Sequence, residues 1–127
     1  DTVMPGLALH DFGELVRTSA STTVEDDPDP SRMDLSLPLF RALVAGYLET
    51  AGGVLNAAER AHLGFAGKMM TYENGIRFLT DFLQGDVYFK VRRPAHNLER
   101  ARSQFALLRS MEEQEDAMNR VVENWHR

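Results

Sequence analysis

The sequence contains no cysteine, which excludes disulfide bonds, thiolate metal sites and a cysteine nucleophile. It also has no apolar run near the roughly 20 residues that a membrane-spanning helix needs, and no signal peptide is visible. These absences favour a cytoplasmic protein with no membrane segment. Basic residues are in the minority, with 14 Lys and Arg against 19 Asp and Glu and a formal net charge of -5. Because an acidic surface repels phosphate backbones, we do not expect nucleic acid as a partner.

What is present is the composition of one ordinary globular domain. The 127 residues are 43% hydrophobic and 26% charged, which suits a single continuous core. The chain opens on Asp1 and not on Met. We interpret it as a piece of a longer protein or as a processed product.

Apolar residues recur at helical spacing along most of the chain, which predicts a mainly α fold of about five helices. Residues 1–10 contain a Pro-Gly turn signal and are expected to form a loop. A helix is predicted over 11–22, with Asp11 as its N-cap. Residues 23–35 are rich in proline and acids and predict a solvated loop. The rest, 36–127, is predicted to form the helical core.

Within this core, three polar residues and several glycines indicate where helices begin and end. Ser36 and Asn56 are expected to cap the starts of two helices, the second with Glu59 as the partner in a capping box. A short break is predicted near 64–67. A long last helix is expected to be capped by Asn97 and to run through Trp125.

The segment 68–84 is apolar around most of a helix circumference and therefore predicts a buried helix. Glu73, Arg77 and Asp81, however, are spaced four residues apart on one narrow stripe. The commoner explanation is a stripe that reaches solvent, with exposed ion pairs that each contribute about 0.3–0.5 kcal/mol. The alternative is a stripe that lines a polar cavity, where carboxylates and a guanidinium bind sugar hydroxyls or an amide oxygen.

Two aromatic residues, Tyr88 and Phe89, lie just beyond the end of this predicted helix. They either offer aromatic faces to a small polar ligand or simply pack under the loop. The four histidines, at 10, 62, 96 and 126, have no metal-ligand spacing, and no serine lies in a nucleophile-elbow motif. The sequence therefore predicts neither a metal site nor a nucleophile.

Three segments, DTVMPGLALHDFGELVR, MTYENGIRFLTDFLQGDVYFKV and HNLERARSQFALLRSMEEQ, carry a family resemblance that extends over most of the chain. They resemble the C-terminal lobe of the aminoglycoside phosphotransferase and choline kinase superfamily. The nearest likeness is to N-acetylhexosamine kinases, which phosphorylate the anomeric hydroxyl of N-acetylglucosamine or N-acetylgalactosamine. The resemblance implies the helical C-terminal portion of a protein-kinase-like phosphotransferase lobe. The acidic loop at 23–35 matches only loosely.

The resemblance also interprets the triplet Asp11-Phe12-Gly13, which is spelled like the magnesium-binding motif of protein kinases. Asp1 resembles the last residue of the family's own metal motif, so the magnesium ligand, the ATP site and the catalytic loop would lie upstream. Asp11 corresponds to a later aspartate that braces the catalytic loop by accepting hydrogen bonds from backbone amides. A carboxylate at a helix N-terminus suits that role.

The same resemblance implies that Arg77 and Tyr88 contact the sugar. We add Glu73, Asp81 and Phe89 as neighbours that the helical geometry would bring to the same place. A role in sugar binding thereby becomes the favoured interpretation of the charged stripe.

These points together lead us to expect an ATP- and Mg²⁺-dependent kinase that acts on a small amino sugar. The chain alone is expected to bind neither ATP nor metal and to be inactive, because the N-terminal kinase region would be missing. Without that region it would expose an apolar surface that favours self-association. Two alternatives remain open: a kinase for another alcohol such as choline or an aminoglycoside, and a non-enzymatic helical module whose last helix binds a partner protein.

Overall fold

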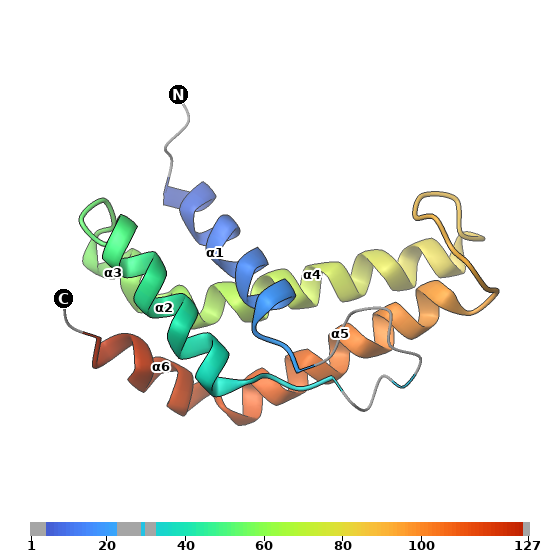
Figure 1. The fold of residues 1–127 in the computed structure, drawn as a ribbon. Coiled ribbons are helices and arrows are strands. Elements are labelled where there is room, and N and C mark those ends of the chain that lie inside the picture. Colours follow the sequence, from blue (N-terminus) through green and yellow to red (C-terminus); the bar gives the residue numbers. More distant parts are fainter. Residues whose placement is uncertain (1–4, 23–28, 30–32, 126–127) are drawn as a thin grey trace.

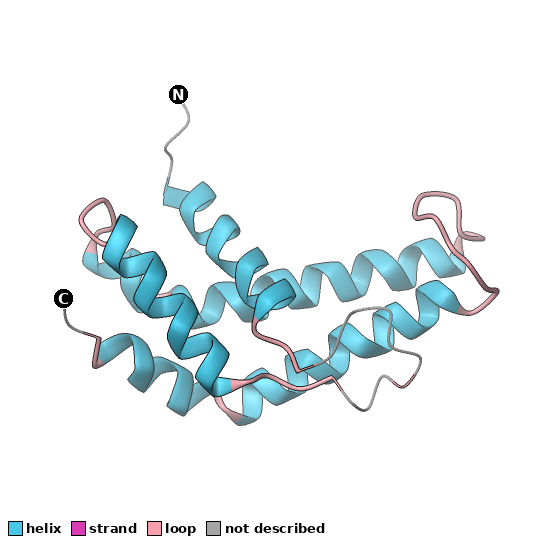
Figure 2. Cartoon of the chain, viewed as in Figure 1, coloured by secondary structure: helices cyan, strands magenta, loops and turns pink. Residues whose placement is uncertain are grey.

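The computed structural model describes residues 5–22, 29 and 33–125. The described residues form six helices and no strand, which confirms the predicted mainly α fold (Figures 1 and 2). In chain order the helices are α1 Pro5–Ser19, α2 Leu37–Ala51, α3 Ala57–Ala61, α4 Leu63–Leu83, α5 His96–Glu113 and α6 Glu115–Glu123.

The longest helix, α4, lies side by side with α5, and α1 packs across α4 (Figure 1). α2 packs against α6. The core lies where these pairs meet, and its fully buried side chains come from five of the helices: Phe12, Val16, Phe40, Val44, Leu48, Leu63, Leu107, Met111 and Met118. The loop between α4 and α5 lies at the end of that pair away from α3 and α6 (Figure 1). It is therefore held by local contacts, remote from the core.

Two of the predicted helix starts are confirmed. The Ser36 side chain accepts a hydrogen bond from the Leu39 amide at 3.3 Å, with Pro38 in the first turn of α2. Asn56 and Glu59 form a reciprocal capping box, with both hydrogen bonds at 2.8 Å. In each case the side chain satisfies an amide that has no partner within the helix.

The boundaries predicted for the first helix are wrong. Helix α1 begins at Pro5, inside the predicted loop, because proline is well suited to a first helical turn where no amide donor is needed. Asp11 consequently lies inside the helix and is exposed, so it does not cap it. The helix ends at Ser19, and a two-residue bridge between Ser21 and Leu35 follows it. The expected roles of Asp1 and of most of the acidic loop at 23–35 lie outside the described residues.

Two other predictions about helix ends are also wrong. The break expected near 64–67 is absent, since Gly64 and Gly67 lie within a continuous α4. The helices instead divide at His62, which lies between α3 and α4. The last helix begins at His96, so Asn97 is not its cap, and it divides at Gln114 into α5 and α6. The Gln114 amide group donates to the Leu35 carbonyl at 3.1 Å, which ties this division to the segment before α2.

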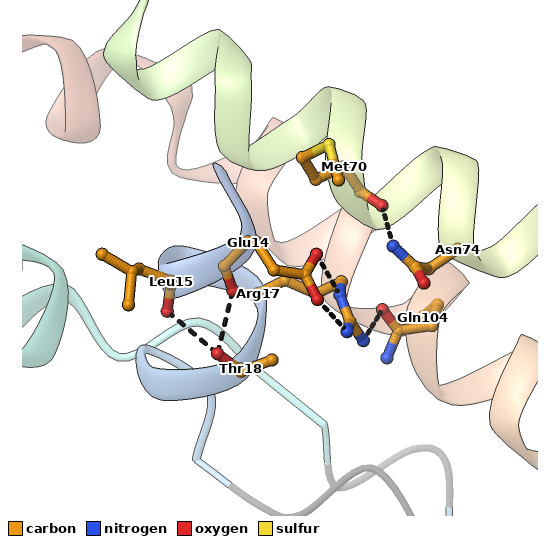
Figure 3. Close-up of polar contacts among 7 residues, drawn as sticks. All are labelled: Glu14, Leu15, Arg17, Thr18, Met70, Asn74 and Gln104. Atoms are coloured by element: carbon orange, nitrogen blue, oxygen red, sulfur yellow. Dashed lines mark hydrogen bonds and ion pairs between the residues drawn. The ribbon is translucent and has the colours of Figure 1, made fainter. Parts of the chain in front are cut away.

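Arg17 joins α1 to the α4/α5 pair, as Figure 3 shows. Its guanidinium donates to both carboxylate oxygens of Glu14, at 3.1 and 2.5 Å, and to the Gln104 side chain of α5 at 3.4 Å. Gln104 is buried, so its oxygen needs this donor. The contact fixes α1 against the middle of the long helix pair.

The prediction that the segment 68–84 forms a buried helix is also wrong. One of its faces packs on α1 and α5, whereas Phe65, Met69, Tyr72 and Ile76 on the other face are each 39–53% exposed. In the described part of the chain, no helix has the length and apolar character to cross a bilayer. The free face of α4 is therefore a surface feature that needs its own explanation.

Candidate functional site

The loop that follows α4 turns sharply back toward α5. Gly85 has φ 94° and Asp86 has φ 61°, both in the left-handed region that glycine and aspartate tolerate best. The Asp86 amide donates to the Asp81 carbonyl at 2.8 Å, which closes the end of the helix. The turn directs the next residues back alongside the last turn of α4.

Asp81 holds this loop in place. Its side chain is 3% exposed and accepts hydrogen bonds from the Tyr88 amide at 2.7 Å and the Phe89 amide at 2.9 Å. Burial raises the pKa of this carboxyl, but the Phe89 and Tyr88 amides and the Asn97 side chain outweigh that effect and lower the pKa below its ordinary value of 3.8. Asp81 is therefore an ionised, buried acceptor whose oxygens are already engaged.

Asn97, from the first turn of α5, completes the anchor. Its amide group donates to Asp81 at 2.7 Å and to Asp86 at 3.1 Å. Its carbonyl oxygen accepts from Arg100 at 3.0 Å. Asn97 is fully buried. Because both its amide group and its carbonyl oxygen have hydrogen-bond partners, this polar side chain is tolerated inside the fold.

The aromatic pair of the loop packs on α4 and leaves one ring open. The Phe89 ring lies 4.7 Å from that of Phe78, and the Tyr88 ring stands edge-on to Phe89 at 4.9 Å. Tyr88 nevertheless is 74% exposed. The Arg77 guanidinium lies 5.7 Å from the Tyr88 ring centre and 5.5 Å from that of Phe89, within the range of a cation–π contact.

These residues surround a shallow hollow of about 320 Å³ on the surface. Its lining residues are Ile76, Arg77, Thr80, Asp81, Gln84, Tyr88 and Phe89. Four of the five predicted sugar-site residues therefore come together here. The fifth, Glu73, is exposed and does not line the hollow.

The four residues that meet at the hollow contribute in different ways. Arg77 offers guanidinium donors and Tyr88 an open aromatic face, which together suit a small polar ligand with one apolar side. Asp81 supports the wall, because its oxygens are taken by loop amides. The Phe89 ring contacts those of Tyr88 and Phe78. For Phe89 this is the packing role that the sequence left open as the alternative to ligand binding.

Sequence reasoning missed three polar residues of this region. Thr80 and Gln84 lie three and seven positions after Arg77, so helical spacing alone could have placed them on the same flank. Asn97 was interpreted as a helix cap. Its true role depends on the loop reaching back to α5, which no local pattern reveals.

Within the described ranges, no group of three histidine or acidic side chains is placed to hold a metal ion. Among the histidines, His96 is buried and its Nδ1 accepts a hydrogen bond from the Arg92 amide at 3.1 Å. No model of a known protein family matches the chain. Its function is therefore inferred from the hollow and from the sequence resemblance.

Proposed function

We propose that this chain is the sugar-binding helical part of an ATP-dependent kinase that phosphorylates an N-acetylhexosamine at its anomeric hydroxyl. The observation that carries the proposal is the position of Arg77 over the rings of Tyr88 and Phe89 at the rim of a hollow. Arg77 and Tyr88 are the two residues to which the resemblance assigns sugar contacts. They are eleven positions apart in the sequence. They meet because the Tyr88 and Phe89 amides donate to Asp81, which holds the loop against α4.

The chemistry of the hollow suits an amino sugar. The exposed Tyr88 ring can cover the acetamido methyl or the apolar face of a pyranose, while Arg77 donates to a hydroxyl or to the acetamido oxygen. Thr80 and Gln84 add a hydroxyl and an amide on the same side. This arrangement would position the acceptor. Positioning is a large part of what a phosphoryl-transfer enzyme must do.

The phosphoryl donor would be bound elsewhere. The resemblance assigns ATP and Mg²⁺ to residues upstream of Asp1. In the proposal, the contribution of this chain is thus to bind and orient the sugar. The exposed face of α4 would be covered by the upstream kinase region or by another protein surface.

A helical interaction module is the second candidate. The observation that favours it is the row of exposed apolar side chains along α4. The last helix, which the sequence suggested as the binding surface, is divided, and it buries Met111, Met118 and Val122 in the core. A binding surface on this module would accordingly be α4.

The test is an ATP-consumption assay on the full-length protein encoded by the reading frame that contains this chain. Acceptors would be N-acetylglucosamine, N-acetylgalactosamine, their non-acetylated amino sugars, choline and an aminoglycoside. We expect ADP release with the N-acetylated sugars, and a sugar 1-phosphate as the product. Turnover with choline or the aminoglycoside alone would show that the chain belongs to a kinase with a different acceptor. No turnover with any acceptor would favour the interaction module.

A further inference from the structure

A groove lies between α2 and α6, at the end of the molecule away from the α4–α5 loop (Figure 1). Its volume is about 630 Å³, which is within the size range of small-ligand sites. Helical spacing brings its lining residues to one flank of each helix. They include Arg41 and Ala45 of α2, Ala117 and Arg120 of α6, and Asn124 and Trp125, which follow α6.

The charge along this groove is of one sign. Arg41 and Arg120 line it, whereas none of the described residues that line it is acidic, although the chain has more acids than bases. Both arginines are exposed, and within the described ranges neither side chain has an ion pair or a hydrogen bond. Asp116 and Glu123 lie one helical turn to either side of Arg120, but they do not line the groove. Because a hollow lined by one sign of charge concentrates counter-ions, this groove should attract anions.

The uncharged lining indicates what kind of anion fits. Ala45 and Ala117 have short side chains, which leave room between the two helices. Trp125 is half-buried, and the Arg60 guanidinium lies 5.7 Å from its ring centre, a cation–π contact that holds the ring at the groove. A guanidinium binds the paired oxygens of a carboxylate or phosphate, while the methyl groups and the indole ring suit an apolar body. A bare inorganic ion would leave this apolar surface uncovered.

We propose that the groove between α2 and α6 binds a small organic anion, with a phosphate or carboxylate head group on an apolar body. Arg41 and Arg120 hold the head group. The apolar body lies against Ala45, Ala117 and Trp125. This site shares no lining residue with the hollow at Arg77, so it does not depend on the proposed kinase function.

Trp125 provides a direct measurement, because it is the only tryptophan of the chain and lines the groove. The probe is phenyl phosphate, and phenol is its neutral counterpart. Phenyl phosphate should change the tryptophan emission saturably and bind about tenfold or more tightly than phenol, because only the phosphate engages the arginines. Isothermal titration calorimetry measures the same binding independently of the fluorescence. No saturable binding of phenyl phosphate by either method, or equal binding of phenol, would overturn the proposal.

Substitutions locate the bound anion. Arg41→Gln and Arg120→Gln should each raise the dissociation constant of phenyl phosphate about tenfold or more, since each removes a charged donor. Arg102→Gln, at an exposed arginine of α5, is the control and should not change it. Ala45→Leu should also weaken binding by filling the groove while both arginines remain, whereas Ala42→Leu, at an exposed position of α2 outside the groove, should not. Undiminished binding in the two glutamine variants would place the anion elsewhere and contradict the proposal.

Discussion

Asp81 determines whether the loop after α4 keeps its shape. One buried carboxylate accepts hydrogen bonds from the Tyr88 and Phe89 amides and from the Asn97 side chain. The Asn97 contact is buried and the two amide contacts are partly buried, so each donor would lose a partner that water does not fully replace. The position of Tyr88 at the hollow follows from this one residue.

Asp81→Asn should loosen the loop, since an amide in place of the carboxylate turns one acceptor atom into a donor facing the Phe89 or Tyr88 amide. We expect hydrogen exchange at those two amides to be about tenfold faster or more, with a lower melting temperature for the whole chain. Glu112→Gln removes the same charge from an exposed position and is the control. Equal exchange rates in the two variants would show that Asp81 does not hold the loop.

The same residue predicts a pH dependence of stability. The pKa of Asp81 is lower in the folded chain than its ordinary value of 3.8, so the unfolded chain binds the proton more readily. Its contribution to the free energy of unfolding should be complete above that value and should disappear as the pH falls through the lower pKa of the folded state. Urea unfolding from about pH 6 downward should show the original chain and Asp81→Asn converging in acid. A difference that stays constant with pH would contradict this.

At the residue scale, helical spacing in the sequence was enough to bring Arg77 and Asp81 to one flank. It could not distinguish an exposed guanidinium from a buried carboxylate. That difference arises because the loop amides fold back over Asp81 alone, four residues further along the helix.

At the scale of elements, the contact between α1 and α4 depends on the absence of a side chain at Gly13. A Cβ atom at this position would fall on the Ala66 carbonyl oxygen and 2.6 Å from Met70 Cγ. Backbone cannot move aside as a flexible side chain can, so the two helices would have to separate. Gly46 in α2, by contrast, would meet nothing within 4 Å.

These two glycines form a matched pair for mutation. Gly13→Ala should lower the free energy of unfolding by about 1–3 kcal/mol through overpacking. Gly46→Ala should raise it by about 0.5–1 kcal/mol, because alanine is the better helix former where nothing is displaced. Chemical denaturation of both variants measures the difference. If both changes stabilise the chain, the α1–α4 contact is not as close as described.

The helix starts at Ser36 and Asn56 were predicted correctly, whereas two glycines that serve tertiary packing were mistaken for a helix break. The caps at Ser36 and Asn56 need only neighbours three residues away. Gly64 and Gly67 looked like a helix break, but a Cβ at Gly67 would lie 2.9 Å from Val16 of α1. The absence of a side chain at Gly67 allows α1 to cross α4 closely. This contact is visible only in the packed structure.

At the scale of the whole molecule, the hollow and the free face of α4 are neighbours on one helix. Ile76 belongs to both, and Arg77, the next residue, lines the hollow. Any protein surface that covers the apolar row will also border the hollow. We therefore expect ligand binding and association to influence each other.

The central claim is that Arg77 binds the sugar, and steady-state kinetics of the full-length protein test it most directly. Arg77→Ala should raise the KM for the N-acetylhexosamine about tenfold or more and leave the KM for ATP unchanged, since a charged hydrogen-bond donor is lost from the acceptor site only. Arg109→Ala, an exposed arginine of α5, is the control and should change neither constant. An unaltered KM for the sugar in Arg77→Ala would contradict the account.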